Sequence, residues 1–142
     1  MKKLIKTILF FLAFELFVKF ANADLIVNES VIETQISREE AVKIFLFYQK
    51  FWNRNGARIT VILPPPDSVL FKKLAIDELN LGPTDYYESV KAKMFAGAAQ
   101  PIFAQSESEI IIKVANTPYS IGYYHGTFKF NSGYGIKTLT IQ

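Results

Sequence analysis

Short apolar runs along the chain predict five β-strands. Residues 25–27 and 59–63 are runs of apolar and β-branched side chains, which are typical of buried strands. Three more strands are expected at residues 120–124, 127–130 and 136–141, and the glycine-rich stretch 131–135 is expected to join the last two as a hairpin.

Apolar residues spaced three and four positions apart predict four helices between these strands. The first begins at Ser37, which has capping-box spacing to Glu40, and its apolar stripe consists of Ala41, Ile44, Phe45, Tyr48 and Trp52. The fourth begins at Ser106, which has the same spacing to Glu109, and it ends before residues 116–118.

Prolines and glycines bound the second and third helices. Three prolines at 64–66 end the strand before them, and Asp67 and Ser68 are both good N-cap residues for the helix that follows. Gly82-Pro83 is expected to end that helix. Thr84 is expected to cap the next one, which carries Tyr87, Val90 and Met94 on one side.

The alternation of strands with helices indicates the fold class. It predicts an α/β domain with a mixed, mostly parallel sheet flanked by about four helices. With 142 residues, 50% of them hydrophobic, the chain is long enough for one domain with its own core.

The first 23 residues form a separate segment. Three lysines precede an apolar run at residues 8–14, and Ala21-Asn22-Ala23 supplies the small residues that precede a cleavage site. This pattern predicts a signal peptide at 1–23 followed by a domain at 24–142, and the apolar stretch is short of the roughly 20 residues of a spanning helix. The alternative is an uncleaved helix lying in the membrane interface.

Charge and cysteine content narrow the possible partners. The formal net charge of +3 comes from the leader, because residues 24–142 carry as many basic as acidic side chains. A neutral domain lacks the basic face that nucleic-acid binding requires. Because the chain has no cysteine, a lipid anchor on cysteine and disulfides are excluded, and a product in the periplasm or outside the cell without stable membrane insertion is expected.

The residue inventory argues against an enzyme. Without cysteine, and with His125 as the only histidine, the chain has no thiol nucleophile and no multi-histidine metal site. The carboxylates Asp77, Glu78, Glu107 and Glu109 are expected to lie on solvated faces. No phosphate-loop or dinucleotide motif occurs, so we predict no catalytic residues, no metal and no cofactor.

The junction at residues 63–69 is the best candidate for a ligand site. A helix that begins at the carboxyl end of a strand offers free amides and a positive dipole end to an anion. Ser68 adds a hydroxyl group there and Val69 an amide. The charge of Asp67 would repel an anion unless Arg58, Lys72 or Lys73 offsets it. The alternative is that Ser68 or Asp67 only caps its own helix.

Several segments together resemble the phosphate-binding proteins of phosphate ABC transporters, and more closely their short single-lobe relatives. They are "LIVN", "ISREEAVKIFLFYQKFWNRNGARITVI", "FAGAAQP", "VANTPYSIGYY" and "GIKTLTI", in the family's order. The resemblance implies a single lobe of a type 2 periplasmic binding protein with inorganic phosphate or a similar oxyanion as ligand. Where the two-lobed binders have an arginine and a "GSGT"-like loop, this chain has "LPPPDSVLF", and Leu46 or Phe47 stands where glycine is usual.

Two functions follow from these patterns. The first is an exported solute-binding-like protein that binds phosphate or a similar oxyanion weakly, with Ser68, Val69, Arg58 and Lys72 as the site. The second is an envelope interaction module that binds no small ligand and uses the same fold to dock a protein partner. Phe47, Phe51 and Tyr87 are then the candidate anchors.

Overall fold

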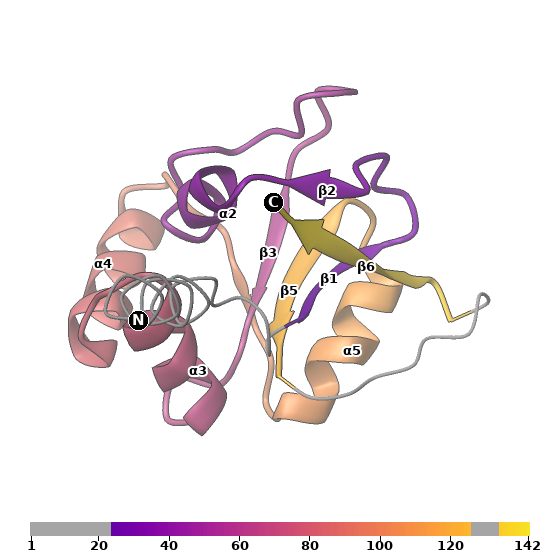
Figure 1. The fold of residues 1–142 in the computed structure, drawn as a ribbon. Helices are drawn as coiled ribbons and strands as arrows, with labels where there is room; N and C mark the ends of the chain where they lie inside the picture. The colour runs from indigo at the N-terminus through magenta and orange to yellow at the C-terminus, as the bar shows by residue number, and fades with distance from the viewer. Residues whose placement is uncertain (1–23, 126–133) are drawn as a thin grey trace, which may run out of the picture.

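A six-stranded mixed sheet organises residues 24–125 and 134–142, the part of the chain that the computed structural model describes (Figure 1). The strands are β1 (Asp24–Asn28), β2 (Gln35–Ile36), β3 (Thr60–Leu63), β4 (Ile102–Phe103), β5 (Ser120–Tyr124) and β6 (Ile136–Ile141). The helices are α2 (Arg38–Phe45), α3 (Val69–Lys73), the π-helix η1 (Leu74–Glu78), α4 (Pro83–Phe95) and α5 (Glu107–Asn116).

The strand order across the sheet is β2-β6-β1-β5-β3-β4. The pairs β2–β6, β3–β5 and β3–β4 are parallel, whereas β1 runs antiparallel to both of its neighbours, β5 and β6. Helix α5 lies on one side of the sheet, and α2, α3 and α4 gather on the other (Figure 1). This architecture confirms the predicted α/β class and mostly parallel mixed sheet.

The long apolar runs were sufficient to predict four of the strands. Strands β1, β3, β5 and β6 lie where the pattern placed them. Strands β2 and β4 were missed, because two residues are too few to show a periodicity. The strand expected at residues 127–130, and most of the turn after it, lie outside the described residues.

Helix α2 begins at Ser37 as predicted but ends at Phe45, three residues before Tyr48. Phe47 adopts the left-handed conformation with φ 63°, the N–H of Phe47 donates to the Ile44 carbonyl oxygen, and that of Tyr48 to the Lys43 carbonyl oxygen. These two bonds form a Schellman motif, which terminates a helix. The predicted stripe to Trp52 is therefore wrong: Tyr48 is exposed, and Trp52 is buried from a loop.

Helix α4 starts earlier than expected. Gly82 is its N-cap and Pro83 its first residue, so this pair opens α4 rather than closing the helix before it, and Thr84 is not the cap. The register also differs, because Tyr86 rather than Tyr87 is fully buried, and its hydroxyl group donates to the Phe45 carbonyl oxygen at 2.7 Å. Of the expected stripe, Val90 is buried and Met94 is exposed.

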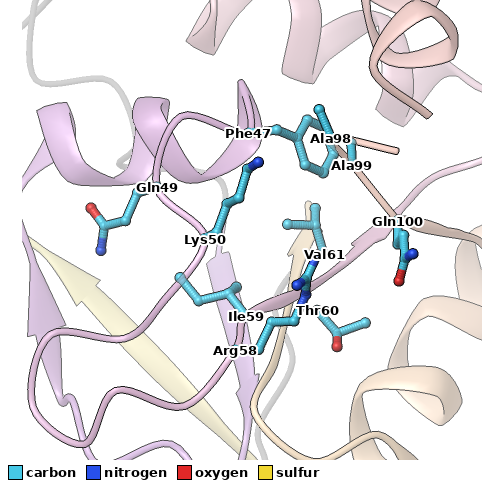
Figure 2. A pocket seen from close by; sticks show the side chains of 10 residues that line it. All are labelled: Phe47, Gln49, Lys50, Arg58, Ile59, Thr60, Val61, Ala98, Ala99 and Gln100. Atoms are coloured by element: carbon cyan, nitrogen blue, oxygen red, sulfur yellow. The ribbon is translucent and has the colours of Figure 1, made fainter. Parts of the chain in front are cut away.

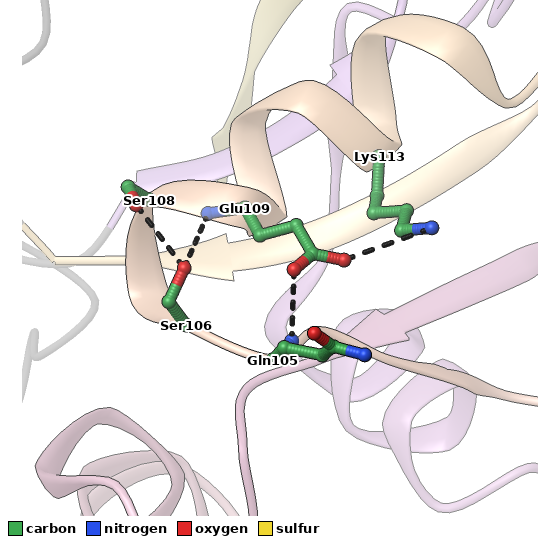
Figure 3. Close-up of polar contacts among 5 residues, drawn as sticks. All are labelled: Gln105, Ser106, Ser108, Glu109 and Lys113. Atoms are coloured by element: carbon green, nitrogen blue, oxygen red, sulfur yellow. Dashed lines mark hydrogen bonds and ion pairs between the residues drawn. The ribbon is translucent and has the colours of Figure 1, made fainter.

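Helix α5 begins with the predicted cap (Figure 3). The Ser106 Oγ accepts the Glu109 N–H at 3.2 Å, and the Glu109 carboxylate accepts the Gln105 N–H and pairs with Lys113. These contacts with Gln105 and Lys113 keep the Glu109 side chain against the surface of α5. The N-terminus of α5 is thereby held by side chains from its own first turns.

Gly122 sets the distance between α5 and the sheet. A Cβ atom at this position would lie 2.9 Å from Val114 Cγ2 and 3.0 Å from Ile110 Cγ2, both on the buried face of α5. Strand β5 can therefore pack against α5 this closely only because residue 122 has no side chain.

Replacing Gly122 with alanine is expected to force α5 away from β5 and to lower the free energy of unfolding by about 1–3 kcal/mol. Urea denaturation measures the change. Gly82→Ala is the matched control, because Gly82 is exposed, has a negative φ and meets only the carboxylate end of Asp85, so it should change stability by less than about 1 kcal/mol. Equal effects of the two substitutions would contradict this account of the packing.

Candidate functional site

The turn between β3 and α3 is built by its prolines and Ser68. The Ser68 Oγ accepts the Phe71 N–H at 3.1 Å and donates to the Pro65 carbonyl oxygen at 2.7 Å. Ser68 is thus the N-cap of α3, as one of the two sequence interpretations required. Val69 follows it at the first helical position with an exposed side chain.

A carboxylate from α5 reaches the same turn. The Glu107 Oε1 accepts the Leu70 N–H at 3.2 Å, across 37 positions of sequence. A negatively charged oxygen is therefore already placed against the first turn of α3. Its position agrees with the preference of a helix N-terminus for negative charge.

The predicted site residues fall into two groups. Ser68, Val69 and Lys72 all follow β3, with Ser68 as the N-cap of α3, Val69 as its first residue and Lys72 in its last turn. Arg58 precedes β3, so a strand of four residues, about 13 Å long, runs between it and the turn before α3. The structure thus brings three of the four residues together. Anion binding by them stays a prediction.

Arg58 instead lines a pocket of about 110 Å³ at the other end of β3 (Figure 2). Lys50 extends into the pocket with its ammonium group directed toward the ring of Phe47. The full lining consists of Phe47, Gln49, Lys50, Arg58, Ile59, Thr60, Val61, Ala98, Ala99 and Gln100. It combines an apolar floor with two cations, two amides and a hydroxyl group, and no carboxylate is among these residues.

Two helix ends form the upper wall of this pocket. Phe47 follows the end of α2, and Ala98 and Ala99 follow the end of α4, where Gly97 adopts φ 74° in a second Schellman motif. The Lys93 ammonium group joins the two ends, since it donates to the Leu46 carbonyl oxygen and lies 4.4 Å from the centre of the Tyr48 ring.

Phe47 occupies the left-handed position that favours glycine. The strain costs about 1–2 kcal/mol, which the burial of the aromatic ring offsets. Of the three aromatic anchors proposed from the sequence, Phe47 is therefore buried. Tyr87 packs edge-on against Phe71 and Phe103, and Phe51 is half exposed.

Glu78 lies in the core, contrary to the solvated position expected for it. It is 6% exposed, and its Oε1 accepts a hydrogen bond from the Tyr123 hydroxyl group at 3.3 Å. The reason is η1: each turn of a π-helix holds an extra residue, which rotates the following side chains relative to an α-helix. Desolvation raises the pKa of Glu78 to about 7, against the lowering effects of the Tyr123 hydrogen bond and of Arg38.

This buried carboxyl group should make the protein less stable as the pH rises. The folded chain keeps the proton on Glu78 up to about pH 7, whereas the unfolded chain releases it near 4.5, so the folded state binds more protons in between. The free energy of unfolding should fall by on the order of 2 kcal/mol across this range.

In Glu78→Gln this fall should be absent, and Glu88→Gln, an exposed control on α4, should retain it. Urea denaturation at pH 5 and pH 8 measures both variants. A pH dependence in Glu78→Gln equal to that of the unaltered protein would refute the assignment.

The lone histidine and the acidic side chains of the described residues do not gather into one cluster. His125 is exposed just after β5, and among residues 24–125 and 134–142 no group of three or more histidine or acidic side chains could hold a metal ion. Within the same residues, no helix has the length and apolarity to cross a membrane.

Comparison with solved structures defines the class of fold. The chain has the fold of one lobe of phosphate ABC transporter binding proteins, since 84% of it matches about half of each such structure. PstS from Borrelia burgdorferi matches with a TM-score of 0.63 and 23% identity, over 47% of that chain. An ABC-type phosphate transport receptor from Vibrio cholerae matches with a TM-score of 0.53 and 15% identity, over 46% of that chain.

A third solved structure matches over 44% of its own length, with a TM-score of 0.62 and 13% identity. It is described as a putative phosphate ABC transporter substrate-binding protein with bound phosphate from Clostridium perfringens. No protein-family model and no curated protein matches the chain. At these identities the likeness shows the fold of the chain.

Proposed function

We propose that this chain is an exported, periplasmic solute-binding-like protein that binds phosphate or a similar oxyanion weakly at the turn before α3. The single observation that supports this function is the contact between the Glu107 carboxylate and the Leu70 N–H. A carboxylate oxygen there stands in for an oxygen of a free anion, so the turn is suited to negative charge.

The same contact accounts for weak binding. A free anion must displace Glu107, or share the turn with it, and the exposed Asp67 beside Ser68 adds a second negative charge. A single lobe also leaves the site open to water, which weakens charge-assisted hydrogen bonds. Lys72, in the last part of α3, is the nearest of the predicted cations in sequence.

Export is proposed from the leader at residues 1–23, and the absence of a cofactor is proposed from the lack of cysteines and of dinucleotide motifs. The likeness to phosphate transport receptors supports a role in solute binding rather than in catalysis. In this proposal the lobe serves a partner in the cell envelope, which is a permease, a sensor or a surface assembly.

Titration calorimetry with inorganic phosphate tests this function. The unaltered protein should bind with a millimolar dissociation constant, and Glu107→Gln should bind several-fold more tightly because the competing charge is gone. Ser68→Ala should bind more weakly, since it removes the hydroxyl group at the turn. Glu88→Gln, which removes an exposed carboxylate on α4 that pairs with Lys91, should behave like the unaltered protein.

Absence of heat in both the unaltered protein and Glu107→Gln at 10 mM phosphate, about ten times the expected constant, would contradict oxyanion binding. That result would favour the alternative function, an envelope module that docks a protein on the same face. The observation that favours this alternative is that the Ser68 hydroxyl and the Leu70 amide already have partners inside the chain, beside the exposed apolar side chain of Val69.

A further inference from the structure

The pocket at the start of β3 holds two cations without an internal counter-charge. Lys50 and Arg58 both line it, and neither is in an ion pair with any carboxylate of the described residues. Lysines on α2 and α4 do have such partners, since Lys43 pairs with Glu39 and Lys91 with Glu88. Two like charges beside one small cavity repel each other, so an incoming anion gains from both.

One exposed aromatic side chain is on the residue paired with Arg58, and two more are at the ends of helices whose following residues line the pocket. Phe51 pairs with Arg58 through the backbone and is 51% exposed. Tyr48 is 70% exposed at the end of α2, and Phe95, at the end of α4, is 97% exposed. The contact of Lys93 with Tyr48 holds these two helix ends together. Large exposed aromatics beside a pocket are typical of protein interaction surfaces.

We propose that this pocket docks an acidic segment of a partner protein, in which a carboxylate side chain adjoins an aromatic or large aliphatic one. The carboxylate lies between Lys50 and Arg58, and the apolar neighbour packs on the exposed aromatics at the ends of α2 and α4. This inference goes beyond the proposed function, because the pocket and the turn before α3 lie at opposite ends of β3.

The surroundings favour a carboxylate over a multiply charged inorganic anion. Both α2 and α4 end at this pocket, and their last carbonyl groups contribute partial negative charge there. That partial charge repels a phosphate dianion about twice as strongly as a single carboxylate, which carries one charge and needs only two donors. The apolar side chains of Ile59 and Val61, with Phe47 in the opposite wall, suit the methylene groups that precede a side-chain carboxylate.

The volume agrees with this occupant. A pocket of about 110 Å³ is too small for a nucleotide and far below the several hundred Å³ of a drug-sized site, but it accommodates the end of a glutamate side chain. Most of the binding surface must therefore lie outside the pocket, on the flanking aromatics, which is the arrangement of an anchored peptide.

Nuclear magnetic resonance titration with the peptide acetyl-Phe-Glu-amide tests the proposal. The amide signals of Lys50, Arg58 and residues 98–100 should shift, with a dissociation constant in the millimolar range. The neutral peptide acetyl-Phe-Gln-amide should bind about fivefold more weakly or worse, because it lacks the charge that the two cations attract.

Matched variants locate the binding. Lys50→Gln/Arg58→Gln should lose about fivefold or more in affinity for the acidic peptide, whereas Lys43→Gln/Lys91→Gln, which removes two exposed and paired lysines, should not. Ser68→Ala should leave peptide binding unchanged, because Ser68 does not line the pocket. Loss of peptide binding can therefore be distinguished from loss of phosphate binding at the turn before α3.

Three results would overturn the docking proposal. They are equal binding of the two peptides, retention of affinity in the Lys50/Arg58 variant, and displacement of the peptide from residues 98–100 by phosphate at equal concentration. The last result would make the pocket a small-anion site instead.

Discussion

The packing of α5 against the sheet depends on the side chain of Asn28. Its Nδ2 donates to the Val114 carbonyl oxygen at 2.8 Å and to the Ala115 carbonyl oxygen at 3.0 Å, at the end of α5. Its Oδ1 accepts the N–H and the hydroxyl group of Ser30, and the Ser30 Oγ accepts the Tyr119 N–H. Every hydrogen-bonding position of this buried amide is satisfied, so β1, the end of α5 and the turn before β5 are locked together.

Both ends of α5 are therefore engaged in tertiary contacts. Asn28 holds its C-terminal end, and at its N-terminal end Glu107 reaches the first turn of α3. A ten-residue helix is about 15 Å long. Through its two ends, α5 therefore fixes the position of the candidate anion site relative to β1. Gly122 completes this arrangement by letting α5 lie close to β5. The proposed site is thus assembled by the same helix that covers one face of the core.

Strand β3 has the turn before α3 at one end and the pocket of Lys50 and Arg58 at the other. At its carboxyl end, a short turn presents amides and a hydroxyl group that are largely satisfied within the chain. At its other end, Lys50 and Arg58 have no carboxylate partner among the described residues and lie beside exposed aromatics. Because β3 separates Arg58 from Ser68, the proposed oxyanion site and the proposed docking pocket share neither of these residues.

Local patterns in the sequence determined the fold class, four strands, and the caps of α2, α3 and α5, because burial periodicity and capping are encoded within a few neighbouring residues. Sequence reasoning also located the turn at Ser68. Only the tertiary structure decided which groups meet. Glu107 contacts Leu70 across 37 positions, Arg58 joins Lys50 rather than Ser68, and Glu78 is buried by the π-helix. Such contacts depend on how elements pack, which no local pattern records, and the left-handed Phe47 is tolerated only because the core buries its ring.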